Sequence, residues 1–211
     1  MLHNISNKIS KLTILCLFLL SSCTTTMVDR AAKYNKYKVL SNISAVDSSF
    51  SELESLLYVD IKSQNMYLLR KGTILKAFKI SSSYYGTGST INSLKTPLGK
   101  HEIYKKIGQD LPINAILKGR VWNGAVANVI TEDIDTDFDH VTSRILWLDG
   151  LENGKNKGPG VDSRSRYIYI HGTAEEGLIG RPASDGCIRM YNTDVIDLFD
   201  LVNEKAQVWI Y

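Results

Sequence analysis

The feature that most constrains the fold is a series of short apolar runs separated by turn residues, beginning at Leu56. The runs occupy 56–61, 66–69 and 73–80, and polar segments at 63–65 and 70–72 separate them. Apolar runs of this length, bounded by Gly, Asn and Ser, are typical of strands joined by tight turns. The segment therefore predicts a three-stranded meander.

One segment near the C-terminus has helical periodicity instead. Asn192 can cap a helix, and Asp194 and Asp197 favour its positive N-terminal end. Its apolar stripe consists of Val195, Leu198, Phe199 and Val202. Further strands are expected at 101–104, 145–148, 167–170 and 207–211. The sequence predicts a mostly β domain with one clear α-helix near its C-terminus.

Three stretches lack a strand pattern. Residues 81–96 are rich in Ser, Thr and Gly, and 149–166 in Gly, Asn and Lys, so both are expected to be loops. Residues 108–142 are expected to be irregular, with acidic residues at 132, 133, 135, 137 and 139. A calcium loop starting at Asp135 would place His140 where Gly is needed and Leu146 where Glu is needed. The prediction for 131–139 is a solvated acidic loop.

The N-terminus has the pattern of an export signal. A basic start precedes Leu12–Leu20, an uncharged apolar run too short for the roughly 20 residues that span a bilayer. Leu20-Ser21-Ser22-Cys23 resembles a bacterial lipobox, which predicts cleavage before Cys23 and a lipid on its sulfur. The residue after Cys23 is Thr24 and not Asp, which resembles the sorting signal that directs lipoproteins to the outer membrane of Gram-negative bacteria. The alternative is an ordinary signal peptide that contains Cys23.

The segment after Cys23 predicts a tether. Residues 24–52 are rich in Ser, Thr, Lys and Asn, with room for a short helix around 28–38. The predicted organisation is a signal peptide over 1–22, a lipidated N-terminus and tether over 23–54, and one domain over 55–211. The net charge of +3 is too small to indicate a nucleic-acid partner.

Two short segments carry residues suited to covalent chemistry. Cys187 follows Gly186, which permits a sharp turn, and His171 ends a predicted strand beside Gly172. A thiol needs a base or a cation to act as a nucleophile at neutral pH, and His is the side chain best suited to take the proton. Taken alone, these residues are also compatible with a buried, unreactive thiol at Cys187 and a purely structural role for His171. His101 and His140 lack a comparable glycine context and are expected to be structural.

Longer strings around these residues resemble the L,D-transpeptidase catalytic domain, of the YkuD type and the ErfK/YbiS-like branch. The strings are YIYIHGT at 167–173, Gly180 and Pro182, and SDGCIRM at 184–190, with Thr96–Gly99 and Arg144–Glu152 upstream. The resemblance covers residues 55–211. It implies a β sandwich of mixed sheets that carries the cysteine in a cleft.

The resemblance also implies roles for individual residues. Cys187 corresponds to the nucleophile, His171 to the general base, and Gly172 to the residue whose carbonyl orients that histidine. The N–H groups of Gly186 and Cys187 are expected to hold an oxyanion. Substrate contacts are expected from Tyr169, Ser184, Asp185 and Arg189. Asp185 departs from the usual Ser/Thr-His-Gly-Cys motif, and its carboxylate is expected either to disfavour the thiolate or to hold a cation, such as Arg181, Arg189 or a substrate ammonium.

The implied reaction is acyl transfer on peptidoglycan stem peptides, with no metal or organic cofactor. The acceptor is a neighbouring stem amine, a lysine of a wall-anchored lipoprotein or a free D-amino acid. One alternative is a carboxypeptidase or amidase of the same fold, and another is a non-catalytic murein-binding lipoprotein. A papain-like protease is disfavoured because the cysteine follows the histidine and no Asn partner is evident. The expected location is the periplasmic face of the outer membrane, with the inner membrane as the alternative.

Overall fold

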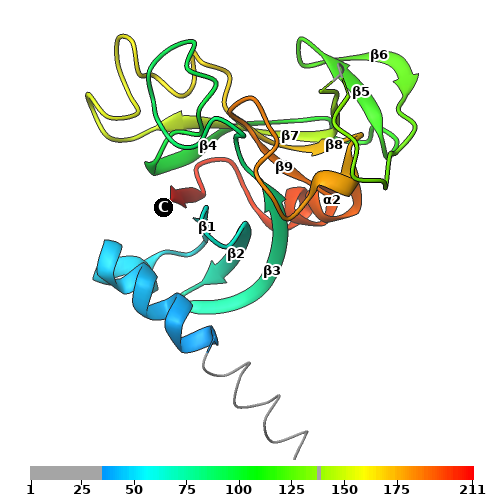
Figure 1. The fold of residues 1–211 in the computed structure, drawn as a ribbon. Coiled ribbons are helices and arrows are strands. Elements are labelled where there is room, and N and C mark those ends of the chain that lie inside the picture. Colours follow the sequence, from blue (N-terminus) through cyan, green and yellow to red (C-terminus); the bar gives the residue numbers. More distant parts are fainter. Residues whose placement is uncertain (1–34, 137–138) are drawn as a thin grey trace, which may run out of the picture. The chain divides into compact units, whose positions relative to one another are not determined.

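The protein is described from a computed structural model that covers residues 35–136 and 139–211 (Figure 1). The predicted signal peptide and Cys23 lie outside the described residues and stay predictions. The chain divides into two units, residues 1–49 and 50–211. In the first unit, residues 35–46 form a helix within the stretch that was expected to be a tether. None of the helices that the described residues form has the length and hydropathy needed to cross a bilayer.

The second unit is built around one ten-stranded sheet with the order β4, β10, β1, β2, β3, β9, β8, β7, β5, β6. The strands are β1 (Leu56–Asp60), β2 (Asn65–Arg70), β3 (Thr73–Ser81), β4 (Gly99–Ile107), β5 (Ala115–Lys118), β6 (Val121–Val126), β7 (Val141–Gly150), β8 (Tyr169–Thr173), β9 (Ile188–Met190) and β10 (Gln207–Ile210). The helical elements are the 3-10 turns η1 (Ser48–Glu52) and η2 (Glu176–Leu178) and the helix α2 (Asn192–Leu201).

The sheet is mixed and closes on itself. β1 with β10 and β8 with β9 are parallel pairs, and the other pairs are antiparallel. β4 pairs with both β10 and β7, so the strands from β4 to β7 in the sheet order form a ring. Closure removes the edges of those strands, which would otherwise expose unpaired N–H and C=O groups. The mostly β class predicted from the sequence is confirmed.

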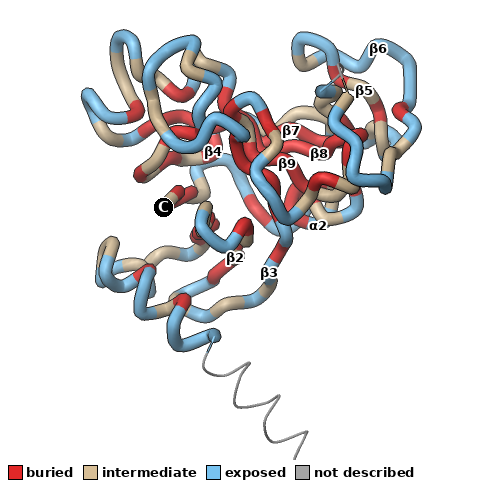
Figure 2. The backbone as a smooth tube through the Cα atoms, viewed as in Figure 1, coloured by how far each residue is buried: buried red, intermediate tan, exposed pale blue. Residues whose placement is uncertain are grey.

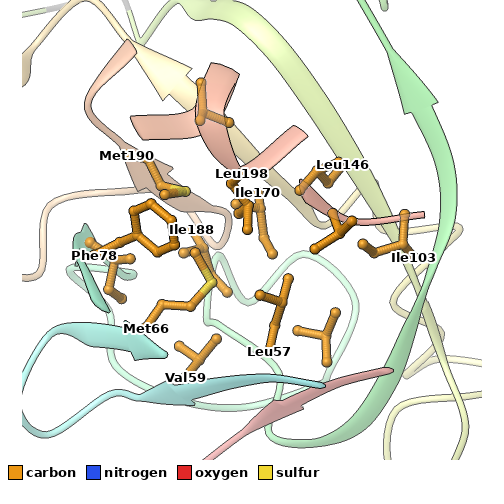
Figure 3. Close-up of a cluster of buried hydrophobic side chains, with 14 of the residues drawn as sticks. Leu57, Val59, Met66, Phe78, Ile103, Leu146, Ile170, Ile188, Met190 and Leu198 are labelled. Atoms are coloured by element: carbon orange, nitrogen blue, oxygen red, sulfur yellow. The ribbon is translucent and has the colours of Figure 1, made fainter. Parts of the chain in front are cut away.

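The core lies between strands on opposite sides of this ring (Figure 3). Leu57 and Val59 of β1 point to the same interior as Ile170 of β8 and Ile188 of β9, and each is fully buried. The predicted apolar stripe is confirmed, since Val195, Leu198, Phe199 and Val202 are all buried. Alternate residues of the strands that line this core face inward, which leaves the intervening side chains for the opposite face.

The predicted helix cap is wrong. Tyr191 precedes α2 without a side-chain cap, and Asn192 is the first helical residue. The Asn192 amide instead donates to Thr173 O at 2.7 Å, and its Oδ1 accepts from Thr142 Oγ1 at 2.6 Å. Asn192 thus ties the start of the helix to β7 and β8. These partners lie 19 and 50 residues away in the chain, beyond the reach of a local capping pattern.

Residues 108–142 also differ from the sequence expectation, because they contain the hairpin of β5 and β6 (Figure 1). All residues of β6 are exposed, so its sequence has no alternation that could identify a half-buried strand (Figure 2). Gly119 and Arg120 join the two strands with φ of 58° and 69°. Two successive positive φ values are typical of the type I′ turn that suits a two-residue hairpin.

Candidate active site

Strand alternation and register bring the predicted nucleophile and base to one face of the sheet. In the parallel pair of β8 and β9, His171 lies opposite Arg189. Ile170 and Ile188 point into the core, so His171 and Arg189 point to the other face. Cys187 directly precedes β9, and its Sγ accepts a hydrogen bond from Tyr169 N at 3.4 Å. Cys187 and His171 therefore lie on the same face of the sheet, with Cys187 Sγ bonded to the backbone two residues before His171.

The ring of His171 is held in one tautomer. The residue is 1% exposed, and its Nδ1 lies 2.8 Å from the carbonyl oxygen of Gly172. A carbonyl only accepts hydrogen bonds, so Nδ1 carries the proton and neutral imidazole keeps a lone pair on Nε2. Burial lowers the pKa of His171, and the nearby Asp139 carboxylate opposes that shift. The ring is thus a neutral base at pH 7.

Gly172 is required by its surroundings as well as by its carbonyl. A Cβ at this position would lie 2.6 Å from Asn192 Oδ1 and 2.8 Å from Thr142 O. Both distances are below van der Waals contact, so any side chain would displace the strand. The absence of a side chain allows β7, β8 and the start of α2 to meet directly beside His171.

Cys187 is a protonated thiol in the resting molecule. The residue as a whole is partly exposed, but its sulfur is enclosed by neighbouring atoms and donates to Tyr167 O at 3.5 Å. Burial of the sulfur raises the pKa of the thiol to about 12, although the Tyr169 N–H and the Arg189 and Arg166 guanidinium groups favour the thiolate. The thiol therefore needs a base at neutral pH.

The turn before Cys187 is held by Ser184. The Ser184 hydroxyl, which is buried, donates to Cys187 O at 2.6 Å and accepts from Gly186 N at 3.3 Å. Gly186 has a φ of 120°, which L side chains rarely adopt. Ser184 therefore stabilises the turn, and its expected contact with substrate stays a prediction. The Gly186 N–H already has this partner, so its use for an oxyanion stays a prediction.

Arg189 is held by two carboxylates that sequence reasoning did not assign to the site. Its Nη1 lies 2.9 Å from Glu175 Oε2, and its Nη2 lies 2.7 Å from Asp139 Oδ2. Glu175 is completely buried and also accepts from the N–H and hydroxyl of Thr136. Asp139 lies at the end of segment 131–139, for which the sequence predicts a solvated acidic loop. Its ion pair with Arg189 shows that this prediction is wrong for Asp139. Glu175 lies close to His171 in the sequence, and this is the only sequence signal that could have indicated its role in the site.

A family model described as the L,D-transpeptidase catalytic domain, YkuD, matches residues 54–210. The chain belongs to this L,D-transpeptidase family. It is 47% identical over 49 residues to YkuD of Bacillus subtilis, which is 23% of this chain and 30% of that protein. YqjB of the same organism is 44% identical over 52 residues, which is 24% of this chain and 28% of that protein. The matched segments thus span less than a third of each of these relatives.

Solved structures of L,D-transpeptidases are also similar to the chain. The enzyme from Mycobacterium smegmatis has a TM-score of 0.44 and 14% identity, over 75% of this chain and 58% of that one. L,D-transpeptidase 3 from Mycobacterium tuberculosis, in complex with a faropenem-derived adduct, has a TM-score of 0.47 and 12% identity. That match covers 74% of this chain and 60% of the other.

In this L,D-transpeptidase domain, Asp185 stands between two hollows. A hollow of about 300 Å³ is lined by Tyr84, Tyr85, Asp135, Thr136, Asp139, Ala183, Asp185 and Arg189. The other, of about 220 Å³, is lined by Ile91, Asn92, Leu94, Ser165, Arg166, Tyr167, Ile168 and Asp185. Arg181 is paired with Asp133, and Arg189 with Glu175 and Asp139. Asp185 therefore holds neither of the two arginines that the sequence suggested for it.

Tyr169 connects the site to the unforeseen hairpin. Its ring is buried, and its hydroxyl accepts from Arg120 Nη1 at 3.1 Å. The Arg120 guanidinium also lies 4.8 Å from the ring centre of Trp147 and 4.9 Å from that of Tyr167. Tyr169 thus anchors the turn of the hairpin, and the predicted substrate contact of its side chain stays a prediction.

Proposed function

We propose that the chain is a peptidoglycan L,D-transpeptidase that uses Cys187 as its nucleophile and His171 as its general base. The observation that carries the proposal is their placement on one face, with the Nδ1 proton of His171 committed to Gly172 O. This tautomer leaves the Nε2 lone pair free to take the thiol proton. Family membership supplies the substrate class, which is the peptide stem of the bacterial wall.

The first half of the reaction forms a thioester. The Cys187 thiol turns from Tyr167 O and gives its proton to His171 Nε2, while Sγ attacks the carbonyl carbon of the L-centre before a terminal D-alanine. The tetrahedral oxyanion is held by backbone N–H groups of the turn before β9. The C–N bond then breaks, the nitrogen takes the proton from His171, and D-alanine leaves.

The second half transfers the acyl group. An acceptor amine loses a proton to His171 and attacks the thioester carbonyl, after which the C–S bond breaks and Sγ regains the proton. Transfer to a neighbouring stem forms a 3→3 cross-link. The protonated resting thiol supports a base-assisted attack in preference to a preformed thiolate.

We further propose that the mature protein is a lipoprotein. In this proposal the signal peptide 1–22 is removed, Cys23 carries lipid, and the domain is held at the periplasmic face of the outer membrane. Metabolic labelling with a lipid precursor, compared between the natural chain and Cys23→Ala, tests the anchor. Labelling of both chains to the same extent would contradict it.

Incubation of the full chain with a disaccharide-tetrapeptide, followed by mass analysis, tests the reaction. The expected products are free D-alanine and a cross-linked dimer. Tripeptide without dimer would assign the chain to the hydrolytic carboxypeptidases. Unchanged substrate would favour the non-catalytic wall-binding alternative and contradict the proposal.

A further inference from the structure

Arg166 is a partly buried cation whose partners are all neutral. Its Nη1 donates to Gly88 O at 3.3 Å, and its Nη2 donates to Lys95 O at 2.7 Å and lies 3.5 Å from Ser93 Oγ. Within residues 35–136 and 139–211, no carboxylate forms an ion pair with it. A guanidinium that is removed from water without a counter-ion costs free energy, so a negative charge that develops nearby would be stabilised.

Arg166 directly precedes the backbone that contacts the Cys187 sulfur. Tyr167 O accepts from Sγ at 3.5 Å, and Tyr169 N donates to Sγ at 3.4 Å. Burial lowers the pKa of Arg166, and the negative charge of a Cys187 thiolate opposes that shift. Burial raises the pKa of Cys187, and the charge of Arg166 is among those that oppose it. The guanidinium and the sulfur are therefore within electrostatic range of each other.

The loop between β3 and β4 connects Arg166 to the turn before β9. A Cβ on Gly186 would lie 3.4 Å from Lys95 O, which is the same carbonyl oxygen that Arg166 Nη2 bonds at 2.7 Å. The other arm of the loop bonds this turn directly, because Tyr84 N donates to Ser184 O at 2.9 Å. The hydrogen bonds of Arg166 thus fix its guanidinium relative to the turn that carries the nucleophile.

The other charges around Cys187 do not supply a net positive charge. Arg189 is the second cation that favours the thiolate, but Asp139 and Glu175 pair with it at 2.7 Å and 2.9 Å. Two carboxylates against one guanidinium leave that group with a net negative charge. The remaining titratable groups of the site bring no positive charge at pH 7: Tyr169, His171 and Asp185. Arg166 is therefore the cation near the sulfur whose charge is not neutralised by a carboxylate of the described ranges.

We propose that Arg166 is a positioning residue that stabilises the Cys187 thiolate when the thiol proton moves to His171. In that step the S–H bond breaks, an N–H bond forms at His171 Nε2, and Arg166 keeps its own protons. The thiolate then lies near an unneutralised guanidinium, and the Asp139 carboxylate favours the imidazolium. This inference rests on the proposed function, because it concerns the activation of the nucleophile in that reaction.

The rate at which iodoacetamide alkylates Cys187 between pH 7 and 9 tests this role, because the thiolate is the reacting species. Iodoacetamide is uncharged, so the charge at position 166 does not alter its approach. In the full chain, Arg166→Gln should lower the rate by about tenfold, the usual effect of losing one opposite charge beside a titrating group. Arg166→Lys should restore most of the rate, because lysine keeps the charge. Mass analysis of the peptide that contains Cys187 separates its signal from those of Cys16 and Cys23.

Arg164→Gln is the matched control, because Arg164 belongs to the same loop, is exposed and lies 3.9 Å from the Asp149 carboxylate. It should leave the alkylation rate unchanged. Thermal unfolding identifies the variants that keep the natural fold, and Arg166→Met is the second neutral variant if Arg166→Gln does not fold. Equal rates in the natural and neutral chains, or an Arg166→Lys chain as slow as the neutral ones, would overturn the role of the charge.

Alkylation requires no peptide substrate, so it separates this inference from the proposed function. Where both hold, Arg166→Gln should lower the maximal rate of D-alanine release by a factor similar to that for alkylation. The tetrapeptide concentration for half-maximal release should change less, because the charge acts on the sulfur. The reverse pattern would overturn the inference. Absence of D-alanine release from the natural chain would overturn the proposed function instead, and the alkylation rates would still decide the role of Arg166.

Discussion

Two buried histidines of this domain show how the environment of one nitrogen separates a structural ring from a reactive one. His101 on β4 and His171 on β8 both place Nδ1 near a backbone carbonyl, at 3.0 Å from Gly99 O and 2.8 Å from Gly172 O. Burial lowers the pKa of both rings, to about 4 for His101. Both are therefore neutral at pH 7.

They differ at Nε2. The Nε2 of His101 lies 3.0 Å from Ser163 Oγ, which fixes that nitrogen in a hydrogen bond. The described residues give the Nε2 of His171 no hydrogen-bond partner, and a thiol lies on the same face of the sheet. Burial and a held tautomer are thus shared by the two histidines. The unoccupied lone pair, on the face of the sheet that also carries Cys187, is what distinguishes a candidate base.

The largest expected effect comes from removing the sulfur that His171 would serve. Cys187→Ala should abolish release of D-alanine from tetrapeptide stems, because Cys187 is the only cysteine that the described part of the chain contains. D-Alanine release is measured enzymatically, and thermal unfolding checks that the variant is folded. Release of D-alanine by this variant at the natural rate would contradict the role of Cys187 as the nucleophile. It would also remove the reason for assigning the base to His171 and not to His101.

Matched substitutions of the two histidines test the comparison directly. His171→Asn should lower the rate of D-alanine release by about 10²-fold to 10⁴-fold, the usual contribution of a general base. His101→Asn should leave the rate unchanged in the folded protein, because His101 lies at a separate hydrogen-bonded position. Asn retains a donor for the backbone carbonyl in each case and lacks a base. Equal losses in the two variants would contradict the assignment of the base.

Acid should destabilise the fold through His101. Its folded pKa of about 4 lies below the unfolded value of 6.5. The stability from keeping the ring neutral is complete above pH 6.5 and is lost as the pH falls toward 4, because the unfolded chain binds the proton first. The loss should reach about 3 kcal/mol of unfolding free energy. Urea unfolding between pH 4 and 7 measures it, and His101→Asn should reduce the slope.

The smallest expected effect comes from the partner of His101. Ser163→Ala should cost about 1–3 kcal/mol of unfolding free energy, because it leaves the buried Nε2 without a partner. It should leave D-alanine release unchanged, since a free Nε2 without a neighbouring thiol has no substrate to activate. Ser165→Ala is the control, because that hydroxyl is exposed and bonds Asp162 O within the same loop. Equal stability losses would show that the Nε2 contact of His101 is unimportant.

Much of the candidate site could be predicted from local sequence. The neighbouring glycines and the family motifs around them identify His171 and Cys187 as site residues. The alternation of side chains along β8 and β9, in which Ile170 and Ile188 point into the core, agrees with the placement of His171 and Cys187 on one face. Glu175 and Arg120 could not be identified in this way. Glu175 bonds Thr136 and Arg189, 39 and 14 residues away, and Arg120 bonds Tyr169 across 49 residues. No local pattern encodes contacts of that span.

The sequence by itself determined the mostly β class, the apolar stripe of α2 and the residues suited to nucleophilic chemistry. These properties depend on neighbours along the chain, where a period of two or 3.6 residues decides which side chains share a face. The tertiary structure alone decided the closed sheet, the parallel register of β8 with β9, the charge balance of Arg189 and the free Nε2 of His171. Those features depend on pairing and burial between distant segments, which the packing of the whole domain establishes.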